Sequence, residues 1–502
     1  MTFYDVAATS SNYNPEGFIK FFKDDSFIKA FNGQTGVTSY INKDGIVIQR
    51  DNISSFFLKS GDYVGYYNYH DVSYPRSRNL QDLLTILAEW CAKPLLNNSS
   101  LIDMSNRMRT VSLSNVMTVS TVHDKSPLVI DEITSGQGES SHLDVNTVVM
   151  SSAASNGAYI VRQTKHYAQH IYGGTSVAMV TGILASDTTA SNVRSKIGVF
   201  DDALNVTEST ADRGGNGLYF QWDNSNGIAA VYRTNVAGSQ VDTMVTRENW
   251  NQDALFDSGT DGYTLFANSN STYVFEWNTH DISRPARLGV LTGGAITYVH
   301  QFSGSNVPGF FGNPSLPIRW EVAHAADIGP TPSAQEIVQG GATVMTDTDG
   351  HMPSRVFAQD SGTLFKTLNS VGSIPLFSIR LAAPYGRSKL HPKKFTVVNT
   401  QQGAIAKWTL VLNGTLVDPT WNPVDSAASW TLFSNTETGC TGGTILSTGF
   451  IVGTSVTGID ISDVLPALSS RMTGTTDIIT VVLSYVQGTA VVSGGIEWVE
   501  TE

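Results

Sequence analysis

Short apolar runs separated by turn residues recur along most of the chain, most clearly between residues 191 and 324. There Gly, Asn, Asp and Ser break the apolar runs about every eight to twelve residues, which is typical of an all-β sandwich or barrel. The clearest single element is a hairpin whose strands, 287–291 and 295–302, flank Thr292-Gly293-Gly294. Its two glycines can adopt the positive φ angles that a tight turn requires.

The same alternation returns from residue 374 to the end of the chain, and Asn413-Gly414 there is a strong hairpin signal between two apolar runs. Asp327–Ser333 carries two prolines and a glycine, which favours a linker. The pattern therefore predicts a mainly β protein with tandem β-sandwich domains of the jelly-roll or lectin-like kind and a small α+β N-terminal domain. The predicted division is a mixed assembly or docking domain, a central sandwich, a linker with short strands, and a C-terminal sandwich, over residues 1–110, 111–326, 327–373 and 374–502.

The N-terminal segment has a different period. Apolar residues spaced by three and four predict one bent helix or two short helices ending at Asn32-Gly33, and a second helix from Leu80 to Cys91. The first of these presents a wide aromatic face, which either packs on its own domain or docks as an arm into a neighbouring subunit. The residues of this docking arm are Phe18, Phe21, Phe22, Phe27, Ile28 and Phe31.

Aromatic residues also mark candidate contact surfaces. A tyrosine cluster near residue 65 is either an aromatic-rich strand pair or a surface for glycan or protein, because tyrosine combines area with a hydroxyl. Two tryptophans, each beside a glutamate, are candidates for stacking on a sugar ring. These candidate glycan or partner contacts are Tyr63, Tyr66, Tyr67, Tyr69, Trp277 and Trp320.

Composition narrows the choice of partners. The chain has 502 residues, and its 44 acidic against 31 basic residues give a net charge of −13, which would repel nucleic-acid phosphates. We therefore expect no nucleic-acid partner. The N-terminus lacks a basic stretch followed by an apolar one, and no apolar run reaches the roughly 18 residues of a membrane span, so we expect neither a signal peptide nor a span. Cys91 and Cys440 are expected to be free thiols.

A set of short segments resembles a β-sandwich domain that recurs in virion structural proteins of tailed bacteriophages, marine and cyanobacterial ones especially, and of large algal DNA viruses. The similarity covers residues 145–325 and rests on Arg162–Lys165, Ser191–Asp202, Gly217–Phe220, Trp250-Asn251, Tyr298–Phe302 and Leu316–Val322. This resemblance implies a component of a virus particle. It brings no catalytic residue with it.

Motifs for catalysis are scarce. The sequence contains no nucleophile-elbow, P-loop, zincin or Cys-x-x-Cys motif. Glu276, Asp281 and Glu321 are the candidate carboxylates for glycoside hydrolysis, but Glu276 and Asp281 would lie on opposite faces of a continuous strand. We therefore predict that the protein is not an enzyme and uses no cofactor.

Metal-binding signals are equally few. Asp347 and Asp349 form either an Asp-Gly turn or a structural cation site, because the glutamate that would complete a calcium loop is absent. The scattered histidines, His166 and His170 among them, are expected to be hydrogen-bonded core or surface residues.

Taken together, these observations predict a structural subunit of a virus particle, most plainly part of a phage tail, baseplate, fibre or adhesion apparatus. The alternatives are a capsid-surface or vertex protein, and a glycan-binding module or glycan hydrolase. The expected partners are copies of the same chain, other virion proteins and a host surface glycan. The expected location is the virion, assembled in the host cytoplasm.

Overall fold

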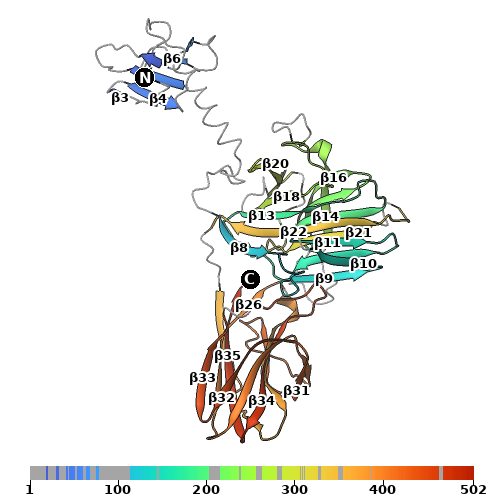
Figure 1. Cartoon of the computed structure of the whole chain (residues 1–502), viewed down its shortest axis with the longest axis vertical. Coiled ribbons are helices and arrows are strands. Elements are labelled where there is room, and N and C mark those ends of the chain that lie inside the picture. Colours follow the sequence, from blue (N-terminus) through green and yellow to red (C-terminus); the bar gives the residue numbers. More distant parts are fainter. Residues whose placement is uncertain are drawn as a thin grey trace. The chain divides into compact units, whose positions relative to one another are not determined.

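The computed structural model describes residues 113–143, 146–202, 215–236, 239–255, 263–279, 285–305, 307, 309, 311–325, 329–348, 354–385, 387–462 and 467–501, together with short strands between residues 18 and 78. The chain divides into two compact units, Met1–Leu101 and Ile102–Glu502. In the larger unit, the strands coloured cyan to yellow form one sandwich, and those coloured orange to red form the next (Figure 1).

The smaller unit shows strands where helices were predicted. β1 (Phe18–Lys20) and β2 (Ala30–Asn32) pair antiparallel, so the predicted helix is wrong at both places. Phenylalanine and isoleucine have a high propensity for strands, and here that propensity overrides the helical spacing. A five-stranded sheet follows in chain order, formed by β3 (Ile41–Asn42), β4 (Gly45–Arg50), β5 (Ser54–Lys59), β6 (Val64–Tyr67) and β7 (Pro75–Arg78).

Several N-terminal candidates can be placed only in part. Tyr66 and Tyr67 lie in β6, and Phe18 and Phe31 lie in β1 and β2. The helix predicted over residues 80–91 lies outside the described residues. So do the remaining tyrosine and docking-arm candidates, which are Tyr63, Tyr69, Phe21, Phe22, Phe27 and Ile28.

The first sandwich of the larger unit consists of two antiparallel sheets. One has eight strands in the order β10-β11-β22-β13-β18-β19-β20, with β8 also paired to β22; the other has seven, in the order β17-β16-β15-β14-β21-β12-β9. The eight-stranded sheet comprises β8 (Ser114–Val119), β10 (Gly138–Leu143), β11 (Thr147–Ser152), β13 (Ser176–Ile183), β18 (Ser271–Trp277), β19 (Ala286–Thr292), β20 (Ala295–Phe302) and β22 (Gln335–Thr346). The seven-stranded sheet comprises β9 (Ile130–Ser135), β12 (Tyr159–Thr164), β14 (Val193–Phe200), β15 (Gly217–Asp223), β16 (Gly227–Val236), β17 (Ser239–Thr246) and β21 (Ile318–His324).

Two turn predictions have different outcomes. The β19–β20 hairpin forms as predicted, with Gly293 and Gly294 at φ values of 56° and 86°. Asn413 adopts the left-handed φ of 57° that a turn needs, but the next strand, Thr415–Val417, pairs with Gly439–Thr441 and not with the preceding strand, Ile405–Leu412. The predicted hairpin at Asn413-Gly414 is therefore wrong, because pairing partners are set by tertiary packing as well as by the turn.

β22 corrects the predicted linker over residues 327–373. This 12-residue strand lies inside the eight-stranded sheet, between β11 and β13. Its buried positions alternate from Gln335 through Ile337 and Gln339, which is the pattern of a strand with one face on the core. The prolines at 330 and 332 precede it and mark only the approach to the strand, not the end of the sandwich.

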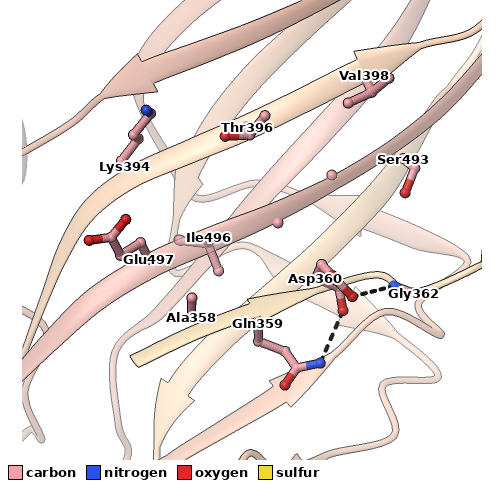
Figure 2. A pocket seen from close by; sticks show the side chains of 12 residues that line it. Ala358, Gln359, Asp360, Gly362, Lys394, Thr396, Val398, Ser493, Ile496 and Glu497 are labelled. Atoms are coloured by element: carbon pink, nitrogen blue, oxygen red, sulfur yellow. Dashed lines mark hydrogen bonds between the residues drawn. The ribbon is translucent and has the colours of Figure 1, made fainter. Parts of the chain in front are cut away.

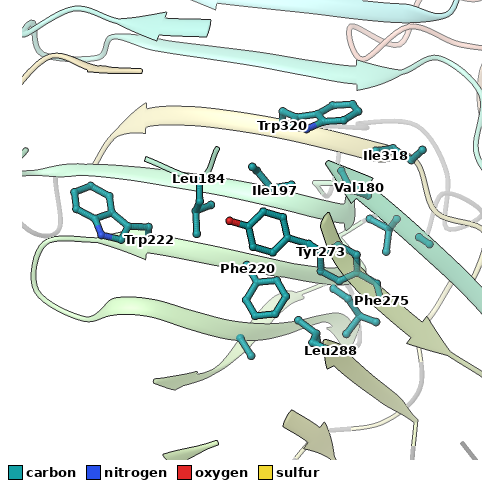
Figure 3. Packing of buried hydrophobic residues seen from close by; sticks show 14 of the residues in the cluster. Val180, Leu184, Ile197, Phe220, Trp222, Tyr273, Phe275, Leu288, Ile318 and Trp320 are labelled. Carbon is teal, nitrogen blue, oxygen red and sulfur yellow. The ribbon is translucent and has the colours of Figure 1, made fainter. Parts of the chain in front are cut away.

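The core between the two sheets is aromatic. The Phe220 ring lies 5.1 Å from that of Tyr273 and 5.7 Å from that of Phe275, so rings from both sheets meet at the centre (Figure 3). Trp277 and Trp320 are fully buried in the same core, and Trp277 Nε1 donates to the Pro314 carbonyl at 2.9 Å. Their prediction as glycan contacts is wrong, because the alternation of their strands turns both side chains inward.

The C-terminal sandwich follows the same plan. A five-stranded sheet has the order β23-β35-β26-β33, with β24 also on β35, and a six-stranded sheet has the order β29-β30-β25-β34-β27-β32. The first comprises β23 (Ser354–Asp360), β24 (Lys366–Leu368), β26 (Lys389–Asn399), β33 (Ser455–Asp460) and β35 (Ala490–Thr501). The second comprises β25 (Ser373–Leu381), β27 (Ile405–Leu412), β29 (Asn422–Pro423), β30 (Thr431–Ser434), β32 (Thr444–Val452) and β34 (Ile478–Gln487), and β28 (Thr415–Val417) pairs with β31 (Gly439–Thr441). The prediction of a mainly β protein with tandem sandwiches is confirmed.

Within the described ranges, the helices are two short 3-10 turns, Arg247–Asn249 and Ala383–Tyr385. Neither has the length or the apolar composition to cross a membrane.

Candidate functional site

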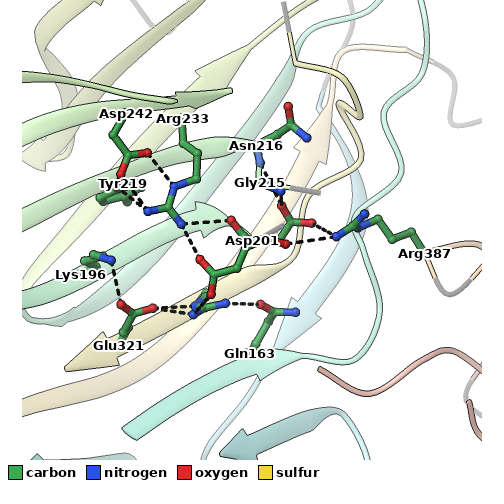
Figure 4. A network of polar contacts seen from close by, with 12 residues as sticks. Gln163, Lys196, Asp201, Gly215, Asn216, Tyr219, Arg233, Asp242, Glu321 and Arg387 are labelled. Carbon is green, nitrogen blue, oxygen red and sulfur yellow. Dashed lines mark hydrogen bonds and ion pairs between the residues drawn. The ribbon is translucent and has the colours of Figure 1, made fainter. Parts of the chain in front are cut away.

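A network of charged side chains lies on the face of the seven-stranded sheet that points away from the core, and most of these side chains are buried (Figure 4). Strand alternation produces this face: in β15, Leu218 and Phe220 point into the core, whereas Tyr219 points outward. The residues that pair with these positions on β14, β16 and β21 follow the same alternation. One side of each strand therefore builds the core, and the other carries a largely buried layer of charged and aromatic side chains.

The network alternates acid and base along its length. Lys196 Nζ lies 2.8 Å from Glu321 Oε1, and Arg319 Nη2 lies 2.6 Å from Glu321 Oε2. Arg319 also pairs with Asp202, which Arg233 reaches at 2.7 Å. Arg233 continues to Asp242, which also accepts a hydrogen bond from the Tyr219 hydroxyl. Each charge is thus matched by a neighbour of opposite sign.

The charged neighbours of Glu321 determine the pKa of its carboxyl and therefore its ionisation state. Burial by itself would raise the pKa of this carboxyl, but Lys196 and Arg319 outweigh burial and hold the pKa well below its usual range. Glu321 therefore remains ionised at neutral pH, so it has no proton to give to a leaving group. Its place is structural, at the centre of the network.

Four of the six segments that carry the virion resemblance lie in this sheet. Arg162–Lys165, Ser191–Asp202, Gly217–Phe220 and Leu316–Val322 supply β12, β14, β15 and β21, which are four successive neighbours in the order β15-β14-β21-β12. Their inward residues pack in the core, and their outward residues form the charged network. Of the other two segments, Tyr298–Phe302 lies in β20 of the eight-stranded sheet and Trp250-Asn251 lies between β17 and β18.

Glu276 lies on the other sheet and does not approach Glu321. It belongs to β18, is fully buried, pairs with Arg287 Nη2 at 2.9 Å and accepts a hydrogen bond from Tyr298. The Arg287 guanidinium lies 3.8 Å from the centre of the Tyr298 ring. Each of these two candidate carboxylates is therefore held by its own cation, and the third candidate, Asp281, lies outside the described residues.

The candidate metal and histidine residues have ordinary structural roles where they are described. Asp347 Oδ1 accepts a hydrogen bond from the Thr175 backbone at 2.6 Å, as expected of a turn, and Asp349 lies beyond the described ranges. His170 bonds Ser176 and Thr279 through its two ring nitrogens. Cys440 is a free, half-buried thiol. Among the described residues, no group of three or more His, Cys, Asp or Glu side chains gathers to hold a metal.

The C-terminal sandwich carries an open groove that the sequence patterns did not indicate (Figure 2). It has a volume of about 450 Å³ and crosses three adjacent strands, β23, β35 and β26. The groove is lined by Ala358, Gln359, Asp360, Gly362, Lys394, Thr396, Val398, Ser493, Gly494, Gly495, Ile496 and Glu497. Register fixes its layout: Gly495 pairs with Asp360 on one side and with Thr396 on the other.

Glycine forms the floor of the groove. A Cβ atom at Gly495 would lie 3.0 Å from the Asp360 Cβ and from the Gln359 carbonyl oxygen, so a larger residue there would crowd both the floor and its wall. Glycine in the interior of a strand is unfavourable unless something must approach the backbone closely. The pair Gly494-Gly495 is therefore the sequence signal that could have indicated the groove.

The polar groups around this floor are held in place. Asp360 Oδ1 accepts from the Gly362 backbone at 2.8 Å, and the Ser493 and Ser361 hydroxyls lie 2.8 Å apart. Gln359 Nε2 donates to the Asp360 carbonyl at 3.1 Å. The groove therefore offers a pre-formed set of donors and acceptors beside the apolar side chains of Ala358 and Val398, and this combination suits a polar organic ligand.

Comparison with known proteins yields structural similarity alone. No family model matches the sequence, and no curated protein matches it. Solved structures that resemble the chain include the endo-β-1,4-glucuronan lyase from the fungus Trichoderma reesei, with 13% identity, 46% of this chain and 95% of that one covered, and a TM-score of 0.32. The endo-1,3-β-glucanase from Streptomyces sioyaensis follows at 10% identity, 47% and 96% coverage and a TM-score of 0.31. A legume lectin-like domain from Entamoeba histolytica has 8% identity, 46% and 98% coverage and a TM-score of 0.27.

These structures share a β-sandwich architecture with the chain, and identities this low bear on the fold only. The prediction that the protein is not an enzyme is contradicted to this extent: a lyase and a glucanase stand beside a lectin-like domain among these structures, so the fold does not exclude an enzyme. The fold is compatible with an enzyme and with a binding protein, so the two must be distinguished by the residues of the site.

Proposed function

We propose that this protein binds glycans and that the groove on the C-terminal sandwich is its binding site. The observation that carries the proposal is the open groove of about 450 Å³ whose glycine floor is flanked by side chains that donate and accept hydrogen bonds. Sugars present many hydroxyls on a compact ring, so they bind where several fixed polar groups surround a small apolar surface.

The dimensions of the groove suit this ligand. Neighbouring strands lie about 4.8 Å apart, so the distance across β35 from β23 to β26 is about 10 Å. That width accommodates one sugar ring over Gly495, with Asp360 and Thr396 on either side. Further rings of an oligosaccharide can continue along the strands, towards Glu497 at one end or Ser493 at the other.

Filling the floor tests the proposal. We expect the wild-type chain to bind at least one glycan on a printed array, and Gly495→Leu to weaken that binding at least tenfold, because the leucine side chain takes the place of the sugar ring. Thr396→Leu fills the same space from β26 and gives a second variant should Gly495→Leu fold poorly. Val356→Leu, at an exposed position of β23 outside the groove lining, is the matched control and should bind as the wild type does.

Two outcomes would contradict the proposal. One is that the folded wild-type chain binds no glycan on a broad array. The other is that both floor variants, shown to be folded by circular dichroism, keep the affinity of the wild type.

We also propose that this binding takes place on a virus particle, in a tail, fibre or other adhesion component built from copies of the chain. The support is the resemblance over residues 145–325, four of whose segments lie in neighbouring strands of one sheet. Light scattering on the full-length chain tests a necessary part of this setting. A homo-oligomer is expected, and a monomer at micromolar concentration would count against it.

A further inference from the structure

We infer that the groove accepts neutral or amine-bearing sugars and rejects acidic ones. This inference rests on the proposed glycan binding and names the ligand class of the same groove. It follows from where three charged side chains lie around the floor: Asp360, Glu497 and Lys394.

Lys394 contributes its stem to the groove, while its charge lies elsewhere. Its Cε is 2.8 Å and its Nζ 3.4 Å from the position that a Cβ atom would take at Gly458, which is on β33. β33 pairs with β26 on the side away from β35. The ammonium group therefore lies over Gly458, which has no side chain to exclude it, and points away from the floor at Gly495.

Register also surrounds this ammonium with acids. Lys394 is the cross-strand partner of Glu497 on β35 and of Asp460 on β33, so a carboxylate neighbours it on each side. Opposite charges in such pairs attract each other. These two carboxylates therefore offset part of the attraction that Lys394 would exert on an anionic ligand over Gly495.

Unlike the Lys394 ammonium, the two carboxylates of the lining, Asp360 and Glu497, lie beside the floor of the groove. Asp360 stands directly beside the floor, with its Cβ 3.0 Å from the position of a Cβ at Gly495, and its side chain is exposed. Glu497 is also exposed, one step along the outward face of β35 from Gly495. Exposed carboxylates are negatively charged at neutral pH, so the field over the floor is negative.

This field selects among sugars. Carboxylates accept hydrogen bonds from sugar hydroxyls and pair with an amine, whereas they repel a uronate, sulfate or sialate brought within a few ångströms. The net charge of −13 adds to the rejection of anionic polymers. Acidic glycans should therefore bind at least tenfold more weakly than neutral or amine-bearing glycans of the same backbone.

The test uses the full chain on an array in which each glycan backbone is present in neutral, amine-bearing and acidic forms. The wild type should bind the neutral and amine-bearing forms and should bind the acidic forms at least tenfold more weakly. Asp360→Asn with Glu497→Gln keeps the shape of the lining and should raise the relative binding of the acidic forms about tenfold. Lys393→Met removes a neighbouring exposed positive charge outside the lining and should leave the order of preference unchanged.

Each contrary outcome is informative. Preferred binding of acidic forms by the wild type, or an unchanged order of preference in Asp360→Asn with Glu497→Gln, would overturn the inference and leave glycan binding intact. Binding to no form at all would overturn the proposed function, and this inference with it.

Discussion

Replacing Arg387 by methionine should destabilise the unit formed by residues 102–502 by about 3–5 kcal/mol. Arg387 belongs to the C-terminal sandwich, and its Nη2 lies 2.8 Å from Oδ2 of Asp201 in the first sandwich (Figure 4). Both side chains are less than a tenth exposed. Removing the cation leaves a buried carboxylate without its counter-charge, and that loss is costly because water cannot replace it.

The surroundings of the pair explain why the effect should reach both sandwiches. The Arg387 guanidinium also lies 5.3 Å from the ring of Tyr167, and burial raises the pKa of the Tyr167 hydroxyl to about 12, so that group remains neutral beside the pair. Asp201 in turn accepts hydrogen bonds from the Gly215 and Asn216 backbones, which join it to the end of β14. The pair thus connects the two domains through buried groups.

Urea unfolding followed by tryptophan fluorescence measures this effect. Arg355→Met is the matched control, because Arg355 lies on an exposed stretch of β23 and should contribute less than about 1 kcal/mol. Adding Asp201→Asn to Arg387→Met should recover part of the loss. A single variant as stable as the wild type would show that the contact between the sandwiches contributes little.

Lowering the pH from 7 to 4 should destabilise the same unit by several kcal/mol. Burial lowers the pKa of His300 and of His391 to about 4, and for His391 the nearby Lys389, His166 and Lys393 lower it further. The native state therefore binds fewer protons than the unfolded chain, whose histidines titrate near 6.5. Stability is fully present above pH 6.5 and is lost as the pH falls through about 4, by about 3 kcal/mol for each ring.

Burial also lowers the pKa of His166, whose ring bonds the Ala467 carbonyl across the two sandwiches. The ion pairs of Glu321 persist in this range, since its pKa lies far below it. The histidines therefore dominate the pH dependence.

Thermal unfolding at intervals from pH 7 to pH 4 checks this expectation. The double variant His300→Gln/His391→Gln should show a flatter profile than the wild type, whereas His123→Gln, at an exposed position, should follow the wild type. A wild-type profile that is flat between pH 6.5 and 4.5 would contradict the assignment of these rings as buried and neutral.

Local patterns predicted the features that depend on neighbouring residues. The β19–β20 hairpin follows from two glycines between alternating strands, and the sandwich architecture follows from the spacing of apolar runs. The same alternation shows that half of each strand faces a core, but it does not say which half. The prediction that Trp277 and Trp320 contact a glycan was therefore wrong, because a tryptophan beside a glutamate is equally compatible with either face.

The groove depends on partners far apart in the sequence. Asp360, Thr396 and Gly495 meet only through the register of β23, β26 and β35. Single-sequence patterns contain no information about that register beyond the glycine pair in β35. The charged network has the same origin, since Arg319 and Asp202 are separated by 117 positions.

A crystal structure of the full-length chain with its tightest-binding glycan tests the central claim most directly. We predict a sugar ring over Gly495, between Asp360 and Thr396, with hydroxyls donating to the Asp360 carboxylate. A glycan bound elsewhere, for example over the charged face that contains Tyr219 and Glu321, with the groove empty, would contradict the assignment of this site.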